Sequence, residues 1–449
     1  MVGVERAAKM SEVFKIFLKQ GIGAPSTPVV KPGDAVFRGQ VIAVLDPAKL
    51  SVDLHSSVTG TVEEVTDNFI SILKTGEVDE SFVKLNQSGS VAEIVRRAGI
   101  LGLGGAGFPS YIKMATKLNE EGYIICNAAE CEPVLEHNLH QIRENPKGLL
   151  DAMTIAMEAT GAGKGIIGIK FKHRDDIKLL TGTIKELGIK HIRVLPLRNV
   201  YPVGEERALI RDTINQLLGT TQLPSEANAV VFNVETLYAI GDAVRDGKPL
   251  IDKFVTVAGE LKGLDPASSK VIRVPVGKKV GAIIDEFGGL NKDIGEILLG
   301  GPYTGKRGSK EDYLTKTLGG IIVTKPFKTI NKEPIGVIQC ACGPLFNRLE
   351  QVVESMDGTL VGHEICKNAV ENNGTFKCKD PGNCPGQAEK VLALKKQGAK
   401  HVIIGHCTDC TNTVMGSAPK LGMEVHHITD HVMETMDRPH MRYYDETQL

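Results

Sequence analysis

The chain has 449 residues, a length that suggests about two to four domains. Its 42% hydrophobic and 24% charged residues are typical of a globular protein that can bury a core. The formal net charge of −1 argues against a general attraction to nucleic acid or to an anionic membrane surface. The sequence shows neither a long apolar run nor a leader-like start, so we expect a cytoplasmic protein with no membrane span. In that reducing compartment, the nine cysteines fit redox or metal chemistry better than disulfides.

The first domain is expected to comprise residues 1–88 and to consist of short β-strands. Apolar runs such as 41–45 and 69–73 alternate with turn signals such as Lys31-Pro32-Gly33-Asp34. This pattern resembles the barrel-sandwich hybrid fold of biotinyl and lipoyl carrier domains. In that resemblance Lys49 lies near the lysine that carries the cofactor, although an ordinary exposed turn lysine is the simpler interpretation.

The second domain, residues 89–250, alternates helical and strand patterns. Strands are expected at 123–126, 165–169 and 191–195, and helices at 92–97 and 175–187. Alternation of this kind predicts an α/β domain with a partly parallel sheet.

Two further domains complete the expected organisation, which combines α/β and α+β units in one chain. Residues 251–328 are rich in β-like runs and carry one short helix. Residues 329–449 form a second α/β pattern, in which apolar strands at 335–338 and 401–404 are each followed by a helical segment.

Residues 102–113 form a glycine-rich loop with the sequence Gly-Leu-Gly-Gly-Ala-Gly-Phe-Pro-Ser-Tyr-Ile-Lys. The spacing of its glycines matches a dinucleotide fingerprint, but that fingerprint requires a preceding strand, and a helical pattern precedes this loop. Backbone N–H groups in such a loop can still surround a phosphate, and a helix starting near Ser110 would direct its positive end there. Lys113 would add a full charge. A glycine-rich turn without a ligand remains the alternative.

Three other stretches place polar side chains where open α/β sheets bind their ligands, at strand ends or helix starts. They are 126–133, 201–208 and 232–237. Together with the glycine loop, they resemble the flavin subunit of respiratory complex I and, more closely, the C subunit of the Rnf complex. By the same resemblance, residues 251–328 would be the small β-grasp-like soluble-ligand-binding (SLBB) module that follows the flavin domain.

The resemblance implies that the second domain binds FMN and NADH. The residues that it assigns to FMN are Gly102, Gly104, Gly105, Lys113, Asn127, Glu130, Tyr201, Gly204, Glu205, Asn233 and Thr236. It places NADH against Phe108, Glu132 and Glu206.

Seven of the nine cysteines lie in the C-terminal domain, where no C-x2-C-x2-C run predicts a standard cubane cluster. Two apolar strands end in the pairs Cys340/Cys342 and Cys407/Cys410. If these strands are parallel neighbours, both pairs share one sheet edge, and we predict that they act as redox dithiols. The alternatives are inert thiols or a metal or iron–sulfur centre. The candidate ligands of that centre are Cys366, Cys378 and Cys384, with a fourth ligand unassigned.

The segment 405–412, combined with the Rnf-like core, resembles the proline reductase-associated electron-transfer proteins of amino-acid-fermenting anaerobes. That resemblance implies an NADH-dependent flavin oxidoreductase that passes electrons through FMN and the C-terminal thiols to a reductase partner, D-proline reductase. Two alternatives are an adaptor that binds an iron–sulfur partner without oxidising NADH, and a scaffold that has lost its cofactor.

Overall fold

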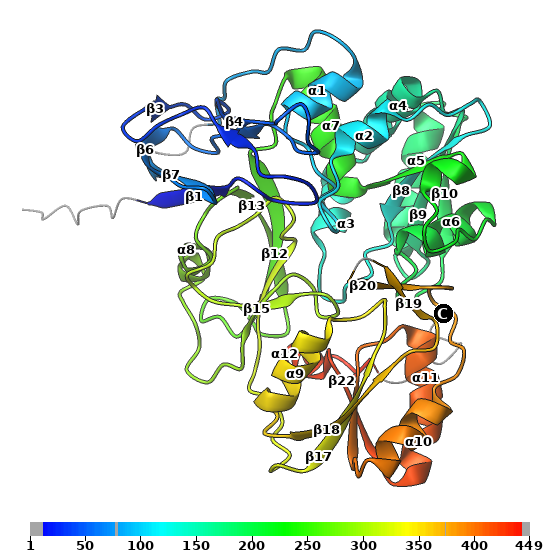
Figure 1. The fold of residues 1–449 in the computed structure, drawn as a ribbon. Helices are drawn as coiled ribbons and strands as arrows, with labels where there is room; N and C mark the ends of the chain where they lie inside the picture. The colour runs from blue at the N-terminus through cyan, green and yellow to red at the C-terminus, as the bar shows by residue number, and fades with distance from the viewer. Residues whose placement is uncertain (1–11, 77–79, 373, 442–449) are drawn as a thin grey trace, which may run out of the picture.

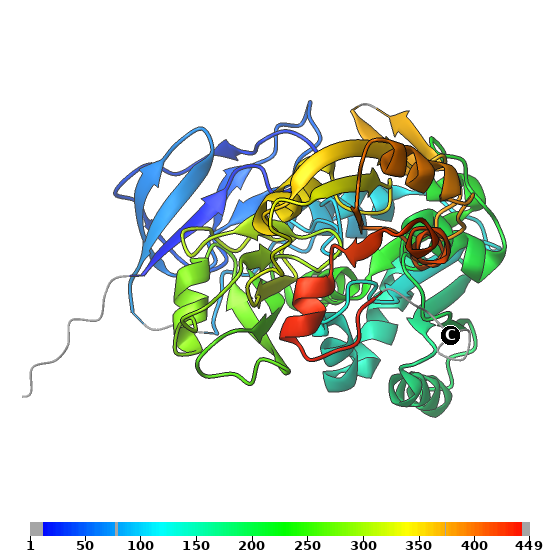
Figure 2. The same cartoon turned by 90° about the horizontal axis from the view of Figure 1, so that it is seen from below.

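The computed structural model describes residues 12–76, 80–372 and 374–441. The chain forms a β-rich unit at the N-terminus, an α/β unit, a second β-rich unit and a C-terminal α/β unit (Figure 1). Seen from below, the C-terminal unit lies in front of the others (Figure 2). It is hydrogen-bonded to the second unit through Cys378 and Arg207, and to the third through Arg348 and Glu296.

The N-terminal unit consists of two small sheets with strand orders β1-β7-β6-β3 and β2-β4-β5. The strands are β1 (Val13–Phe17), β2 (Thr27–Pro28), β3 (Ala35–Val36), β4 (Val41–Val44), β5 (Leu54–His55), β6 (Gly60–Val65) and β7 (Phe69–Lys74). Alternation along β1 buries Phe14 and Ile16 and leaves their neighbours half-buried on the other face. Lys49 lies in the β4–β5 connection, where its side chain is 61% exposed and pairs with Asp46.

The second unit has a four-stranded parallel sheet with the order β10-β9-β8-β11. Its strands are β8 (Tyr123–Ala128), β9 (Lys164–Lys170), β10 (Ile192–Leu197) and β11 (Ala229–Asn233). Its helices are α1 (Val91–Arg97), α2 (Ser110–Ala115), α3 (His137–Glu144), α4 (Pro146–Thr160), α5 (Arg174–Glu186), α6 (Glu206–Ile214), η1 (Pro224–Ala227) and α7 (Val234–Asp246). Helices cover the sheet, so nearly every residue of β9 is buried, as in other parallel sheets. The partly parallel sheet predicted from the alternation is therefore present.

The third unit is a mixed sheet with the order β13-β12-β16-β14-β15 and one helix. Its elements are β12 (Asp252–Gly259), β13 (Ser269–Pro275), α8 (Val280–Glu286), β14 (Ile297–Leu299), β15 (Lys306–Gly308) and β16 (Gly320–Val323). The apolar side of α8 packs on this sheet through residues such as Ile283 and Ile284.

The fourth unit has a parallel sheet with the order β18-β17-β21-β22 and a two-stranded hairpin. Its elements are β17 (Pro334–Gln339), α9 (Phe346–Ser355), β18 (Thr359–Ile365), β19 (Ala369–Asn372), β20 (Thr375–Cys378), α10 (Ala388–Lys396), β21 (His401–Ile404), α11 (Thr408–Ser417), η2 (Pro419–Leu421), β22 (Glu424–His427) and α12 (Asp430–Thr435). The two strands predicted at 335–338 and 401–404 are adjacent and parallel. Both therefore end at the same sheet edge.

Buried ion pairs connect the units. Glu296 of the third unit accepts hydrogen bonds from Arg348 and His431 of the fourth, at 2.8 Å each. Burial alone would raise the pKa of Glu296, but the bonds from His431 and Arg348 outweigh it and hold the pKa well below its usual range. Arg38 of the first unit donates to both carboxylate oxygens of Asp252 in β12, at 2.9 and 2.7 Å. The units are thus joined by partnered buried charges.

Candidate functional site

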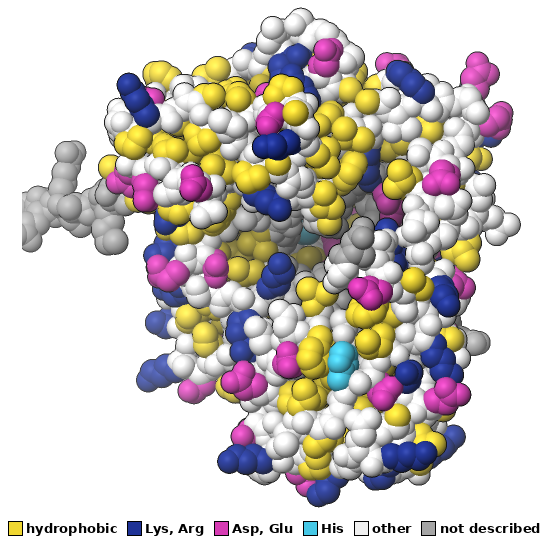
Figure 3. All heavy atoms as spheres, in the orientation of Figure 1, with side chains coloured by type: hydrophobic (Ala, Val, Ile, Leu, Met, Phe, Trp, Pro, Cys, Tyr) yellow, Lys and Arg dark blue, Asp and Glu magenta, His cyan; other side chains and the backbone are white. Residues whose placement is uncertain are grey.

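A cleft of about 1230 Å³ lies where the four units meet. Its wall includes residues 17 and 19–23 of the first unit, 103–106 of the second, 299–301 of the third and 341–343 of the fourth. Figure 3 shows the molecule hollowed between its upper and lower parts in this view. The contribution of the N-terminal loop was not predicted from the sequence, because nothing in its local pattern shows which surface it covers.

The glycine loop leaves α1 and turns back on itself before α2. The backbone N–H of Gly102 donates to the carbonyl of Phe108 at 2.8 Å, and that of Leu103 donates to Thr236 Oγ1 at 3.0 Å. A Cβ on Gly104 would lie 2.6 Å from Asn233 Nδ2, closer than real contacts allow. Any larger residue at 104 would therefore displace the Asn233 side chain. As expected, a helix precedes the loop, so this is not a strand–loop–helix dinucleotide fingerprint.

Most of the residues assigned to the nucleotides by resemblance border the cleft. Those that line it are Gly104, Gly105, Asn127, Glu130, Glu132, Tyr201, Gly204, Glu205 and Asn233. The others, which are absent from its wall, are Gly102, Phe108, Lys113, Glu206 and Thr236.

Lys113 and Glu206 contact each other behind the cleft. Lys113 Nζ donates to Glu206 Oε1 at 2.8 Å and to the carbonyl of Val231 at 2.9 Å. In this structure the two charged side chains therefore pair with each other. Thr236 supports the glycine loop by accepting the hydrogen bond from Leu103.

The loop after β10 is tied to the end of β8. Asn127 Nδ2 donates to the carbonyl of Gly204 at 2.8 Å, and the N–H of Gly204 donates to Cys131 Sγ, also at 2.8 Å. A Cβ on Gly204 would approach that sulfur to 2.9 Å. These contacts hold Tyr201 and Glu205 at fixed positions in the cleft wall.

Two acidic side chains at the end of β8 differ in their partners. Asn138 Nδ2 donates to Glu130 Oε2 at 2.6 Å, yet burial dominates and raises the pKa of Glu130 to about 7. Glu132 instead accepts backbone hydrogen bonds from Tyr303 at 2.7 Å and Thr304 at 2.9 Å. Asn138 was missed in the sequence because it lies in a helix without a recognisable motif.

The cleft has the features that FMN needs. The exposed loop 104–106 presents backbone groups, α2 begins just beyond it, and the volume accommodates a ligand of this size. Asn127, Glu130 and Asn233 offer polar atoms for the flavin or its side chain. The residues present therefore fit the cofactor.

Tyr201 connects this cleft to the C-terminal unit. Its ring stacks on Tyr303, with centroids 3.7 Å apart and planes 3° from parallel, and its hydroxyl donates to the carbonyl of Cys342. Its backbone also exchanges two hydrogen bonds with Thr408, each 2.9 Å long. Because Cys342 lines the cleft as well, the carboxyl edges of the two parallel sheets meet here.

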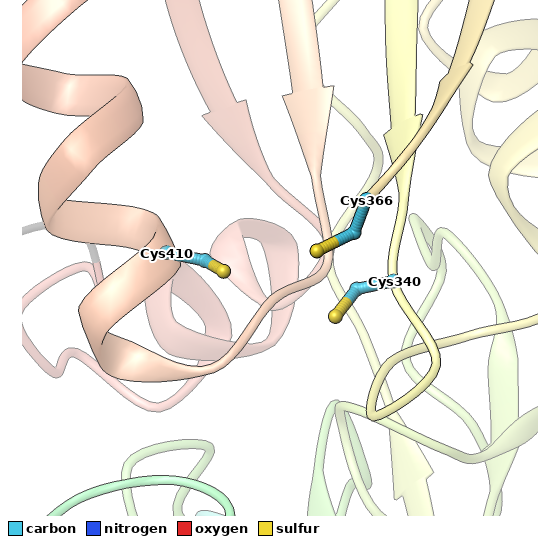
Figure 4. A group of neighbouring side chains, drawn as sticks. All are labelled: Cys340, Cys366 and Cys410. Carbon is cyan, nitrogen blue, oxygen red and sulfur yellow. The ribbon is translucent and has the colours of Figure 1, made fainter. Parts of the chain in front are cut away.

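The C-terminal cysteines gather at that edge. The sulfur atoms of Cys340, Cys366 and Cys410 lie within 4.8 Å of one another, and Figure 4 shows them pointing into one shared space. Cys410 also interacts with Cys384 and Cys407. The two sequence-predicted pairs are therefore close together in space.

The candidate metal ligands named from the sequence do not form one group. Cys366 and Cys384 both interact with Cys410, whereas Cys378 interacts with Cys342. His406 precedes Cys407 in the sequence and is fully buried, and burial lowers its pKa below the ordinary value. A positive imidazole there at neutral pH is therefore not supported.

Within the described ranges, no helix is long and apolar enough to cross a membrane.

Comparison with known proteins defines the class first. Residues 95–242 match the Nuo51 FMN-binding domain, and residues 4–95 match the RnfC barrel-sandwich hybrid domain. The chain is thus an electron-transfer flavoprotein of the oxidoreductase type, with an FMN-binding domain behind a barrel-sandwich domain. The predicted barrel-sandwich fold and the predicted FMN-binding domain are both confirmed.

The relatives then define the family. The chain is 30% identical to the C subunit of the Na⁺-translocating ferredoxin:NAD⁺ oxidoreductase complex of Acetobacterium woodii, over 66% of this chain and 69% of the relative. It is 33% identical to the C subunit of the proton-translocating ferredoxin:NAD⁺ oxidoreductase complex of Clostridium ljungdahlii, over 69% and 70%. The cobalamin reductase PduS of Salmonella typhimurium is 33% identical over 52% of this chain and 49% of that protein. The chain belongs to the RnfC-like family.

Together the two domain matches cover residues 4–242, and the C-terminal cysteines lie beyond them. The arrangement of those cysteines is compatible with a metal or iron–sulfur centre.

Proposed function

We propose that the protein oxidises NADH at FMN in the cleft and transfers the electrons through its C-terminal cysteines to a reductase partner. One observation carries this proposal: Cys342 lines the same cleft as Gly104, Asn127 and Asn233. A cofactor in that cleft would thus lie against a thiol of the C-terminal unit. The SLBB-like interpretation of residues 251–328 and the division at residues 88, 250 and 328 are part of the same proposal.

FMN, when bound, accepts a hydride and releases electrons to a second acceptor. The chain would hold it by the backbone of 104–105, with Asn233 beside the loop and Asn127, Glu130 and Glu205 along the wall. Three residues outside the cleft wall would hold the loop and the helix starts in place: Gly102, Lys113 and Thr236. Tyr201 would cover the side facing the cysteines, since it is both part of the cleft wall and bonded to Cys342.

NADH would approach from the side of Phe108, Glu132 and Glu206. In this structure Glu132 is bonded to the backbone of residues 303–304, and Glu206 is paired with Lys113. Nucleotide binding at these acids therefore requires them to exchange partners. That observation favours a second candidate function, an adaptor that binds FMN and an iron–sulfur partner without oxidising NADH.

The partner that we propose is D-proline reductase. Support comes from the resemblance of segment 405–412 to proteins associated with that enzyme. The electrons would be carried by Cys340, Cys342, Cys407 and Cys410. Cys342 lines the cleft and contacts Cys340, which contacts Cys410, which in turn contacts Cys407.

The decisive experiment is an anaerobic absorption spectrum of the FMN-reconstituted protein before and after addition of NADH. Bleaching of the flavin bands supports NADH oxidation. If the bands persist with NADH but bleach with dithionite, the adaptor function is correct. A protein that retains no flavin after reconstitution contradicts both candidate functions.

A second experiment tests the transfer of electrons from the C-terminal cysteines to the reductase. The double variant Cys407→Ser with Cys410→Ser is expected to keep NADH-dependent bleaching and to lose electron delivery to purified D-proline reductase. Cys126→Ser is a suitable control, because Cys126 is buried within β8 of the flavin unit. Unchanged delivery by the double variant would rule out this route.

A further inference from the structure

The cysteines at the edge of the C-terminal sheet are too numerous and too close for a simple dithiol. Cys340 follows β17, Cys366 follows β18 and Cys410 lies in α11, and their mutual sulfur separations are all within 4.8 Å. A disulfide can join only two of these three, and the third would remain a buried thiol. A single ion bound by four thiolates at about 2.3 Å places the sulfur atoms about 3.8 Å apart. The observed group is therefore suited to one metal ion.

A buried amide provides independent evidence. Gln387 is fully buried, and its Nε2 lies 3.1 Å from Cys366 Sγ, 3.7 Å from Cys384 Sγ and 3.6 Å from Cys410 Sγ. The residue occupies the N-cap position of α10, but its side chain does not cap the helix, and its Oε1 has no hydrogen-bond partner among the residues that the structure describes. An amide donor directed at sulfur atoms is favourable when those atoms are thiolates.

The same amide identifies the fourth sulfur. Cys384 shares the Gln387 donor with Cys366 and Cys410, and its thiol interacts with that of Cys410. Cys407 also touches Cys410, but in the described part of the chain the Gln387 amide is directed at the other three sulfur atoms. Cys342 interacts with both Cys340 and Cys378. Among the described residues it receives no hydrogen bond from Gln387, and it lines the flavin cleft, so we place it and Cys378 outside the group.

We propose that Cys340, Cys366, Cys384 and Cys410 bind a thiophilic metal ion, such as zinc or iron, and that Gln387 positions their thiolates by N–H···S hydrogen bonds. Several adjacent buried thiolates repel one another, and a divalent cation compensates that charge. Each ligand loses its thiol proton on binding. The site lies beside Cys342, the thiol that faces the flavin cleft. Of the four cysteines of the proposed electron route it takes Cys340 and Cys410 as ligands, which leaves Cys342 and Cys407 as free thiols. Its metal does not depend on whether NADH is the electron donor.

The test uses the full chain, reduced and metal-free, titrated anaerobically with Co²⁺ alone. The expected result is one Co²⁺ per chain, with thiolate-to-cobalt charge-transfer absorption and the visible bands of a tetrahedral ion. Cys384→Ser is expected to lose that absorption. The matched variant Cys407→Ser, which removes a buried thiol that also contacts Cys410, is expected to keep it.

Gln387→Leu is expected to keep the stoichiometry and to weaken Co²⁺ binding by roughly 10–100-fold, as the loss of a hydrogen bond to a metal ligand does. FMN uptake by each variant shows that the rest of the chain is folded. Failure to bind Co²⁺ overturns the proposal, as does equal binding by wild type and Cys384→Ser, or loss of binding in Cys407→Ser alone. Elemental analysis of the protein as purified then distinguishes zinc from iron.

Discussion

The flavin cleft and the cysteine group both lie at the carboxyl edge of a four-stranded parallel sheet, but the chain forms them in different ways. The cleft depends on backbone geometry, since a Cβ on Gly104 or Gly204 would strike a neighbouring side chain. The cysteine group depends on side chains delivered by three separate loops and a helix. A backbone site tolerates little change at its glycines, whereas a side-chain site can change its chemistry when one residue is replaced.

The largest effect is expected where the C-terminal unit is attached to the rest of the molecule. Glu296→Ala leaves the buried Arg348 without its carboxylate partner and should lower the free energy of unfolding by about 3–5 kcal/mol. Urea unfolding followed by circular dichroism measures this change. The control Asp285→Ala removes an exposed ion pair with Lys310 and should have little effect. Equal stability of both variants would mean that the Glu296 contacts do not hold the two units together.

One pH effect on stability is expected in the cleft. The raised pKa of Glu130, about 7 against 4.5, means that folding takes up a proton between these values, so stability is lost as the pH rises through this window. Glu130→Gln abolishes this proton uptake. It should therefore remove a pH-dependent loss of up to about 3 kcal/mol in the free energy of unfolding. The change in stability is measured by thermal unfolding of the flavin-free protein at pH 5 and 7.5. Glu63→Gln, on the exposed side of β6, should melt like wild type at both values.

Cofactor affinity should respond to the glycine loop. Gly104→Ala pushes Asn233 away from the loop and should weaken FMN binding by about tenfold or more, equivalent to about 1.4 kcal/mol. Quenching of flavin fluorescence measures the affinity. Gly182→Ala, whose added Cβ meets nothing within 4 Å, should bind FMN normally. Wild-type affinity in Gly104→Ala would show that the loop does not hold the cofactor.

The smallest effect is expected at the junction of the two sites. Tyr201→Phe keeps the ring stack on Tyr303 but removes the hydrogen bond to the Cys342 carbonyl, a loss of about 1 kcal/mol. It should slow electron delivery without altering NADH-dependent bleaching, as stopped-flow absorption can show. Tyr238→Phe removes comparable bonds to the carbonyls of Gln141 and Asn145 within the flavin unit and should not slow delivery. Equal rates of electron delivery by both variants would show that the Tyr201 hydroxyl takes no part in the electron route.

The contrast between a site built from contiguous backbone and a site built from distant side chains also determines what could be predicted from the sequence. The glycine loop, its preceding helix and the following helix are contiguous, so the local pattern indicated their structure. The FMN-binding domain was identified from the resemblance of this loop and three other stretches to a flavin subunit. Strands 335–338 and 401–404 were predicted from their apolar residues, and so was their shared edge. The selection of Cys384 over Cys378 beside Cys410, and the role of Gln387, depend on how the loops return over that edge. No local spacing encodes those long-range contacts.

The wall of the cleft begins at residue 17 and ends at residue 343, and this has a consequence for biosynthesis. During translation the N-terminal units emerge and fold before the later ones. The part of the chain that emerges first therefore forms an incomplete cleft, open on the side that residues 341–343 later occupy. A nascent chain halted before that point would have its glycine loop but not its full enclosure, so stable capture of the flavin should occur late, when synthesis of the C-terminal unit is under way or complete.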